Sequence, residues 1–156
     1  MEACGGKWEN VSEAVFQGTA ALTLDGKGRM TVPARHRDAL SSGPDRTLTF
    51  TKSPVGCLLV FQTSAWEDFR RQLLALPMQA DGWRRLFLGS AVAVDIDSAD
   101  RVLVPAELRG WAGLDREVLL MGMGRRLELW DAQRYAAHEA QILAGPVPDV
   151  VQGFVF

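Results

Sequence analysis

Short apolar runs alternate with turn-forming residues in the first half of the chain, a pattern typical of short strands. We expect strands at 19–24, 29–32, 47–51 and 57–61. A short helix is predicted at 34–40, directly after Pro33, because proline suits a first helical turn, where its missing N–H costs nothing. Gly26-Lys27-Gly28 then predicts a tight hairpin turn, with both glycines supplying positive φ.

A longer helix is expected to close this half. Thr63 or Ser64 is the predicted cap, and Pro77 the predicted stop. The apolar positions between them follow helical spacing, at Trp66, Phe69, Leu73 and Leu76. The same signals predict a short helix at 83–88.

The second half repeats this order of elements. Strands are expected at 91–96, 101–104, 117–121 and 127–130. Asp131 is predicted to cap a closing helix that ends at Gly145-Pro146 and carries Tyr135, Ile142 and Leu143 on its apolar positions. The tail from 147 onward gives no clear structural signal.

A repeated motif explains this similarity. Asp25, Arg29, Pro33 and Ala34 have counterparts 72 residues later, at Asp97, Arg101, Pro105 and Ala106, and Arg37 likewise has Arg109. Further on, Leu58, Phe61 and Trp66 match Leu127, Trp130 and Tyr135 at an offset of 69. A single Asp-to-Arg spacing is a common accident, whereas its recurrence with downstream elements indicates a duplication.

A two-stranded hairpin is too small to be stable alone, so each hairpin is expected to pair with its counterpart in the other repeat. The predicted fold is therefore α+β, mainly β, with two tandem swapped-hairpin repeats that form a pseudo-two-fold barrel with flanking short helices. We assign the repeats to 15–77 and 91–144, a connecting helix to 78–90 and a C-terminal tail to 145–156. The polar leader, 1–14, is expected to be disordered or to precede a native start at Val15.

Composition narrows the class of protein. Hydrophobic residues make up 47% of the chain and charged residues 23%, as in globular proteins. No apolar run is long enough to span a bilayer, and the leader is no secretory signal. With only two cysteines, a cytoplasmic location is expected. The net charge of −2 argues against indiscriminate coating of nucleic acid and leaves room for a local basic patch.

The first turn supplies such a patch. Between Asp25 and Asp38 the chain carries Lys27, Arg29, Arg35 and Arg37, a net charge of +2. The matching stretch from Asp97 to Arg109 has a net charge of −1. A surface that faces phosphates should be positive and sterically open, so these counts favour the first turn.

A purely structural role is the alternative for several of these residues. Asp25 and Asp97 are expected to orient an arginine and fix a turn, and Arg101, in its acidic setting, is assigned the same structural role. For Lys27 and Arg29, composition alone leaves both roles open.

Chemistry of other kinds finds little support. His36 and His138 are the only histidines, and no Cys/His cluster has metal-ligand spacing. No nucleophile or acid/base constellation is present, so an enzyme is disfavoured, and neither a cofactor nor a small-molecule substrate is expected. An oligomeric protein-interaction scaffold that does not bind DNA stays open as a rival to a DNA-binding module.

The motifs together resemble the MraZ family. The matching segments are Phe16-Gln17-Gly18, the run from Leu24 to Pro33, Leu86-Phe87-Leu88-Gly89 before the second Asp97-to-Arg101 motif, and Glu128-Leu129-Trp130-Asp131. The resemblance covers about residues 15–156 and implies two AbrB-type swapped-hairpin domains whose subunits form a ring. It further implies a nucleoid-associated regulator that binds short direct repeats in double-stranded DNA upstream of the division and cell-wall gene cluster. The family controls that cluster, including its own gene, and typically represses it.

By position, the family's DNA-reading loop falls on Lys27, Gly28 and Arg29 of this sequence. Its weaker extensions fall on Arg35 and Arg37 in the following helix and on Arg84 and Arg85. The second motif departs from the family, with Asp100 where members usually have glycine and Ala99 where the first copy has Lys27. The resemblance therefore predicts DNA contact by the first turn.

Overall fold

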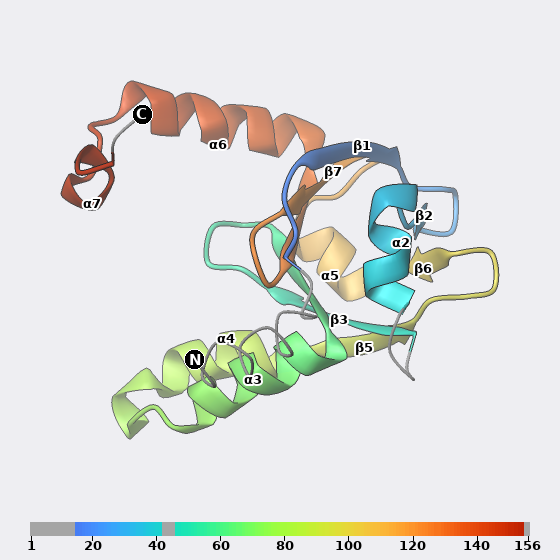
Figure 1. The fold of residues 1–156 in the computed structure, drawn as a ribbon, viewed down its shortest axis with the longest axis horizontal. Coiled ribbons are helices and arrows are strands. Elements are labelled where there is room, and N and C mark those ends of the chain that lie inside the picture. Colours follow the sequence, from blue (N-terminus) through green and yellow to red (C-terminus); the bar gives the residue numbers. More distant parts are fainter. Residues whose placement is uncertain (1–14, 42–45, 155–156) are drawn as a thin grey trace, which may run out of the picture.

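The computed structural model describes residues 15–41 and 46–154, and the prediction for the leader lies outside them. The first repeat consists of β1 (Thr19–Thr23), β2 (Arg29–Thr31), α2 (Ala34–Ser41), β3 (Thr47–Lys52), β4 (Leu58–Gln62) and α3 (Thr63–Leu74). The second consists of β5 (Val92–Asp95), β6 (Arg101–Leu103), α5 (Ala106–Trp111), β7 (Glu117–Gly122), β8 (Leu127–Asp131) and α6 (Ala132–Ala144). Between them lie the 3₁₀ helix η1 (Met78–Ala80) and α4 (Asp81–Gly89), and α7 (Asp149–Gln152) follows α6 (Figure 1).

The two repeats pair with each other through β1–β7, β2–β6, β3–β5 and β4–β8, as the duplication predicts, whereas β3–β4 and β7–β8 pair within one repeat. The larger sheet has the order β1-β7-β8-β4-β3-β5, and β2 pairs with β6 in a separate two-stranded ribbon. Because β1 to β4 correspond to β5 to β8, this order reads the same from either end, which is a pseudo-two-fold arrangement. The fold is α+β with mainly strands, as expected.

Two details of the prediction are wrong. β1 and β2 form no ladder with each other, because β1 pairs with β7 and β2 with β6. They are joined by a tight turn and then diverge to their partners in the other repeat. Among the described residues the strand ladders also close no barrel, since β1 and β5 are the two edges of the larger sheet.

The core lies between the large sheet, the ribbon and helices α2 and α5. Equivalent positions of the two repeats meet there, as where Met30 pairs with Val102 and each is 1% exposed. Leu58 and Leu129, paired across β4 and β8, are fully buried. Burying side chains of this size contributes roughly 1.5–3 kcal/mol each, so the shared core holds the repeats together as one unit.

Helix ends confirm one predicted cap and correct another. The Asp131 side chain accepts a hydrogen bond from the Arg134 backbone N–H at 3.0 Å and caps α6, as predicted. At α3 the N-cap is Gln62, without a side-chain cap bond, so neither Thr63 nor Ser64 has the predicted role. The tail, where no element was predicted, contains α7.

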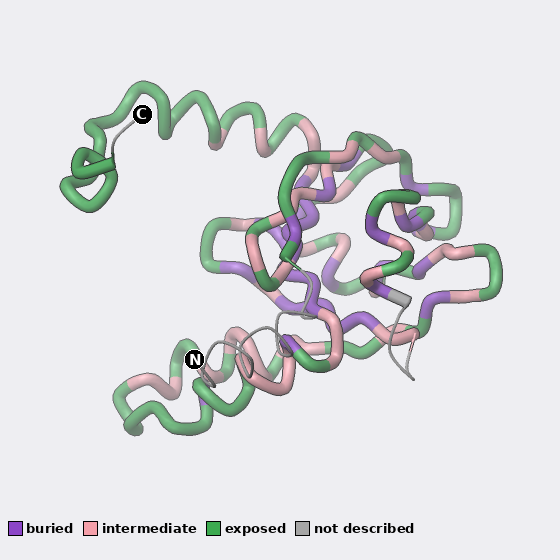
Figure 2. Tube along the Cα trace, viewed as in Figure 1, coloured by how far each residue is buried: buried purple, intermediate pink, exposed green. Residues whose placement is uncertain are grey.

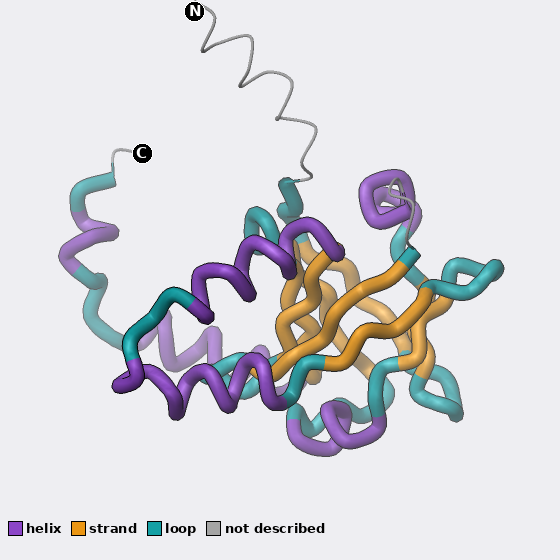
Figure 3. Tube along the Cα trace, turned by 90° about the horizontal axis from the view of Figure 1, so that it is seen from below, coloured by secondary structure: helices purple, strands orange, loops and turns teal. Residues whose placement is uncertain are grey.

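Two helical arms extend from the same side of the body. The α3–α4 hairpin (63–89) and the C-terminal arm, α6 with α7 and the residues to 154, both run away from the end where the β1–β2 and β5–β6 turns lie (Figures 1 and 3). The C-terminal arm is exposed along most of its length (Figure 2), and no residue of α6 is buried. The molecule thus has the two turns at one end and two arms at the other.

Candidate nucleic-acid interface

The first turn is built on the carboxylate of Asp25. One oxygen, Oδ1, accepts hydrogen bonds from the backbone N–H groups of Lys27 and Arg29, both at 2.9 Å. The backbone closes the turn through Asp25 N–H to the Arg29 carbonyl at 2.9 Å and Gly28 N–H to the Asp25 carbonyl at 3.0 Å. Aspartate is suited to this position because its short side chain reaches backbone groups two residues on.

The same carboxylate orients Arg29. The guanidinium donates from Nε to Asp25 Oδ2 at 2.7 Å, and its terminal nitrogens make no hydrogen bond among the described residues. The pKa of Asp25 is lowered to about 2, first by the Arg29 backbone N–H and then by the Arg29 side chain and the Lys27 N–H. The pair therefore stays charged at neutral pH.

The second turn repeats this geometry. Asp97 Oδ1 accepts from the N–H groups of Ala99 at 2.8 Å and Arg101 at 2.9 Å, and Arg101 Nε donates to Asp97 Oδ2 at 3.2 Å. These contacts, led by the Arg101 backbone N–H, lower the pKa of Asp97. These are the hydrogen bonds expected of the structural role predicted for Asp25, Asp97 and Arg101. Arg29 makes the same hydrogen bonds as Arg101.

Only one of the two glycines in the first turn requires positive φ. Gly28 has φ +87°, and its counterpart Asp100 has φ +60°, whereas Gly26 does not adopt this conformation. Gly28 is also buried, and a Cβ there would overlap the guanidinium of Arg109. Gly28 therefore contributes to the predicted DNA-reading loop through its backbone conformation. It shapes the turn beneath Arg109, an arginine of the other repeat.

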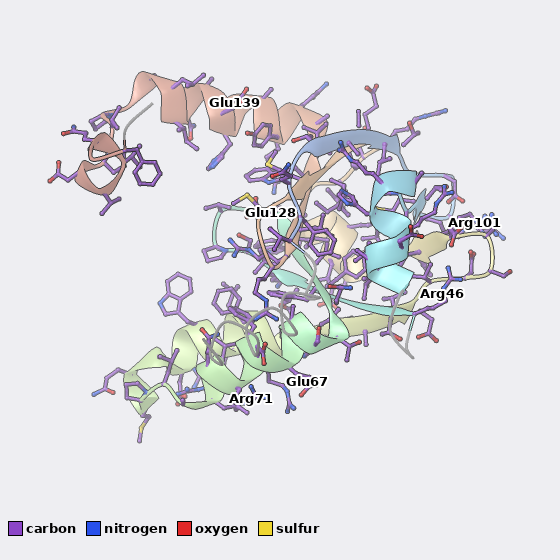
Figure 4. The ribbon with its side chains drawn as sticks, viewed as in Figure 1. Arg46, Glu67, Arg71, Arg101, Glu128 and Glu139 are labelled. Carbon is purple, nitrogen blue, oxygen red and sulfur yellow. The ribbon has the colours of Figure 1, made fainter. Side chains whose placement is uncertain are left out.

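The two turns lie side by side because the ribbon connects them. Val32 N–H donates to the Asp100 carbonyl at 2.8 Å, and Val104 N–H donates to the Gly28 carbonyl at 3.0 Å. Met30 and Val102 face the core, so the outer face of the ribbon carries the alternate residues Arg29, Thr31, Arg101 and Leu103. In Figure 4, Arg101 and Arg46 lie together at this end of the molecule.

Arginines cross between the repeats at these turns. Arg37 Nε donates to the Val32 carbonyl at 3.0 Å and lies 3.7 Å from Asp100 Oδ2, so it stands beside the second turn and not the first. Arg109 is its counterpart, donates to the Val104 carbonyl at 2.9 Å and covers Gly28 of the first turn. Sequence counts, which add each arginine to its own repeat, place both at the wrong turn.

Arg46 is a site residue that the sequence analysis missed. Its Nη2 atom donates to Asp100 Oδ1 at 2.6 Å and to the Asp97 carbonyl at 3.3 Å. It directly precedes β3, 51 residues before Asp97, and Arg116 holds the corresponding place directly before β7. The Arg46 carbonyl accepts from Ile96 N–H and the Arg116 carbonyl from Leu24 N–H, which are equivalent positions of the two repeats. The repeat therefore carries a signal for this pair of arginines that the sequence analysis did not use.

The remaining predicted arginines lie elsewhere. A Cβ at Gly18 would lie 3.3 Å from Arg35 Nη1, so this guanidinium points to the start of β1, whereas the turn follows its end. Arg84 donates to the carbonyls of the α3 end and the following loop, at Leu73, Leu76 and Pro77, and pairs with Asp81. Arg85 is exposed on α4 and lines a pocket with Pro105, Glu107 and Leu108, whereas neither turn contributes to that pocket.

Other kinds of site find no support in residues 15–41 and 46–154. No three His, Cys, Asp or Glu side chains gather there as a metal site would require. Within the same residues, every helix is too short or too polar to cross a membrane.

Comparison with known proteins agrees with the duplicated motif. The family model for MraZ protein, an antitoxin-like family, matches twice, at residues 15–86 and 87–149. The chain belongs to the MraZ family. The second match shows that both repeats, including the one with Asp100 and Ala99, carry the MraZ pattern.

Similar proteins carry the name transcriptional regulator MraZ. The protein from Leptothrix cholodnii is 60% identical over 141 residues, which is 90% of this chain and 97% of the relative. Those from Methylibium petroleiphilum and Burkholderia vietnamiensis are 55% and 54% identical, over 94% and 91% of this chain and the whole of each relative. This MraZ chain is thus similar to these relatives over nearly their full length.

Proposed function

We propose that the chain is a sequence-specific DNA-binding transcriptional regulator that contacts DNA through the first turn and the outer face of the β2–β6 ribbon. A B-DNA major groove, about 12 Å wide, admits a two-stranded ribbon. The observation that carries the proposal is that Asp25 binds Nε of Arg29, while the two terminal nitrogens make no hydrogen bond among the described residues. Those nitrogens are the donors with which arginine recognises O6 and N7 of guanine.

Lys27 complements Arg29 as a phosphate contact. It is exposed at the tip of the turn, and the described residues show no hydrogen bond or ion pair of its amino group. A lysine in this position neutralises phosphate charge without reading sequence, which strengthens binding at low salt. The names of the similar proteins support regulation of transcription as the outcome of this contact.

The target follows from membership of the MraZ family. We propose that the chain acts in the cytoplasm, on the nucleoid, and binds short direct repeats in the promoter of the division and cell-wall cluster. By the same resemblance it represses that cluster, including its own gene.

We further propose that the chain works as a ring-shaped homo-oligomer in which the C-terminal arm of one copy docks on the α3–α4 hairpin of the next. A 13-residue helix is marginally stable in water unless it packs against something, yet no residue of α6 is buried. The arm exposes large apolar side chains at Leu143, 79%, and Val150, 80%, and the hairpin does so at Met78, 80%, and Trp83, 55%. Docking of one copy's arm on the hairpin of another copy would cover the apolar side chains of both surfaces.

Charge also favours this pairing. Beyond Arg134 the arm contains Glu139 and Asp149 and neither lysine nor arginine, whereas the hairpin carries four arginines against three acidic residues. A contact between two different surfaces is head-to-tail, and such contacts generate a ring when the rotation closes. A ring presents several first turns to successive repeats, so later contacts gain from effective concentration.

A DNA-independent interaction scaffold is the second candidate, and the exposed arms are the observation that favours it. The two functions differ in what the turns do. Under the scaffold hypothesis, loss of Arg29 leaves every activity of the protein intact.

A gel-shift assay with DNA from upstream of the chain's own gene tests the proposal. We expect a shifted complex that survives excess unrelated competitor, because specific sites are typically bound about a thousandfold or more tighter than non-specific DNA. Folded Arg29→Ala protein should lose this complex, and the surface variant Val55→Ala should retain it. Equal competition by specific and unrelated DNA would exclude sequence-specific binding.

A further inference from the structure

We propose that Arg101, in the second turn, is a second DNA-reading residue, so that each chain presents two equivalent arginines, Arg29 and Arg101, to the same stretch of DNA. This inference rests on the proposed DNA-binding function and extends it to the repeat that sequence counts set aside. The inference is based on the charges and contacts around Arg101 in the folded molecule. There, arginines of the first repeat lie beside the second turn, which the sequence counts do not show.

The acidic character of the second turn disappears in the folded chain. Asp100, which made the sequence count negative, is bound by Arg46 at 2.6 Å and faced by Arg37 at 3.7 Å. Counting the charges that meet at this turn, Arg37, Arg46 and Arg101 stand against Asp97 and Asp100, which is a net charge of +1. The second turn is therefore positive, as a phosphate-facing surface requires.

The first turn has the same sign when counted in the same way. Lys27, Arg29, Arg109 and Arg116, the counterpart of Arg46, stand against Asp25, a net charge of +3, because Arg109 covers Gly28 and Arg116 lies beside Asp25 and Gly28. The contrast between the two turns falls from three charges in the sequence to two in space. Lys27, whose counterpart is Ala99, and Asp100, whose counterpart is Gly28, account for that difference.

Arg101 is also held and exposed as Arg29 is. Each donates Nε to the aspartate four residues earlier, at 3.2 Å for Arg101 and 2.7 Å for Arg29, which leaves two terminal nitrogens in each. The Arg101 side chain is 39% exposed and that of Arg29 28%, so Arg101 is no less accessible.

The ribbon determines how far apart the two arginines act. Arg29 pairs with Leu103 and Arg101 pairs with Thr31, so the arginines sit at diagonally opposite corners of one outer face. From strand rise and spacing, their Cα atoms are about 8 Å apart, which corresponds to about two to three base steps. One chain therefore addresses two guanines within a single short repeat of DNA.

Fluorescence anisotropy with the operator duplex tests this inference. The parent protein, Arg29→Ala, Arg101→Ala and the control Val55→Ala, at an exposed residue in the turn between β3 and β4, are compared after each is shown to be folded by circular dichroism. We expect Arg101→Ala to weaken operator binding roughly tenfold or more, as loss of a bidentate arginine does, and Val55→Ala to leave it unchanged. If folded Arg101→Ala binds as tightly as the parent while Arg29→Ala does not, the inference is wrong.

Conservative variants and modified DNA keep the test decisive if Arg101→Ala does not fold. Replacing single guanines by 7-deazaguanine removes N7, and the parent should lose affinity at two positions in each repeat. Arg101→Lys, which keeps the charge without the planar fork, should be insensitive at one of them and Arg29→Lys at the other. Sensitivity unaltered by Arg101→Lys would overturn the inference, whereas failure of the parent to bind the operator would overturn the proposed function itself.

Discussion

At the residue scale, a single carboxylate organises each of the two turns. An aspartate followed four residues later by arginine gives, in both repeats, a carboxylate that binds two backbone N–H groups and one Nε. These contacts are local, so the sequence alone predicts them. The contacts of Arg37, Arg46 and Arg109 are not local, because the exchange of segments brings each to a turn that its position in the chain does not indicate.

His36 is a buried residue whose protonation should affect stability. It is 5% exposed, and its Nε2 atom has no hydrogen-bond partner in the structure. Burial, with a smaller contribution from nearby Arg35, lowers the pKa of His36 below its ordinary value of 6.5. As the pH falls below 6.5, the unfolded chain takes up this proton before the folded chain does. Stability that is fully present above 6.5 is therefore lost between 6.5 and the lower pKa of the folded state.

The variant His36→Leu tests this prediction, because Leu108 occupies the equivalent position in the second repeat and is also buried. Urea unfolding at pH 7.5 and 5.5 should show a larger loss of unfolding free energy for the parent than for the variant. The pKa values of Asp25, Asp68 and Asp97 are lowered, so these carboxylates remain charged over that range. An identical loss in both proteins would contradict the assignment.

At the scale of elements, strands and helices were predictable within a few residues, whereas their partners were predictable only through the repeat. Turn residues and apolar periodicity mark where β1, β2, β5 and β6 begin and end. They do not show that β1 and β2 separate, because a tight turn ordinarily joins paired strands. Pairing between the repeats buries more of each strand, and that gain is a property of the whole fold.

Gly122 illustrates a constraint that no local pattern shows. It lies at the end of β7, where a Cβ would overlap the backbone at Phe16 and Gln17, and its N–H donates to the Gly18 carbonyl at 2.8 Å. Because backbone cannot move aside as a flexible side chain does, Gly122→Ala should lower the free energy of unfolding by about 1–3 kcal/mol.

Gly82→Ala is the matched control for this substitution. A Cβ at Gly82 in α4 meets nothing within 4 Å, so this variant should be neutral or slightly stabilising. Chemical denaturation of both variants measures the difference. Equal stability of the two variants would show that the segment before β1 is not packed tightly against β7.

At the scale of the whole molecule, the arms are where sequence reasoning was incomplete. The apolar positions Tyr135, Ile142 and Leu143 correctly predicted a helix and would ordinarily indicate a face turned to the chain's own core. Ile142 and Leu143 are instead 61% and 79% exposed. Periodicity reports that a face is apolar, and it cannot distinguish a face that covers its own core from one that binds another copy.

Leu143→Asp should therefore disrupt the oligomer. A charge placed in an apolar contact is costly unless it is paired, and the change lies on an exposed residue, so folding of the single chain should be unaffected. Sedimentation velocity should show an oligomer for the parent and a smaller species for Leu143→Asp. Gln133→Glu, at the other end of α6, is the control that should keep the parent's size. An oligomer unchanged by Leu143→Asp would exclude the arm as the contact.

The central claim, that the β2–β6 ribbon faces DNA, is tested most directly by photo-crosslinking. A photoreactive residue replaces Leu103, which is 46% exposed on the outer face of the ribbon, or Val55, which is 49% exposed in the turn between β3 and β4. Leu103 lies on the proposed DNA-facing surface but is not one of the arginines that read the bases, and in Figure 1 the β3–β4 turn lies away from the two DNA-facing turns. We predict crosslinks to operator DNA from position 103 and none from position 55. Crosslinks from position 55, or bound DNA without crosslinks from position 103, would contradict the account.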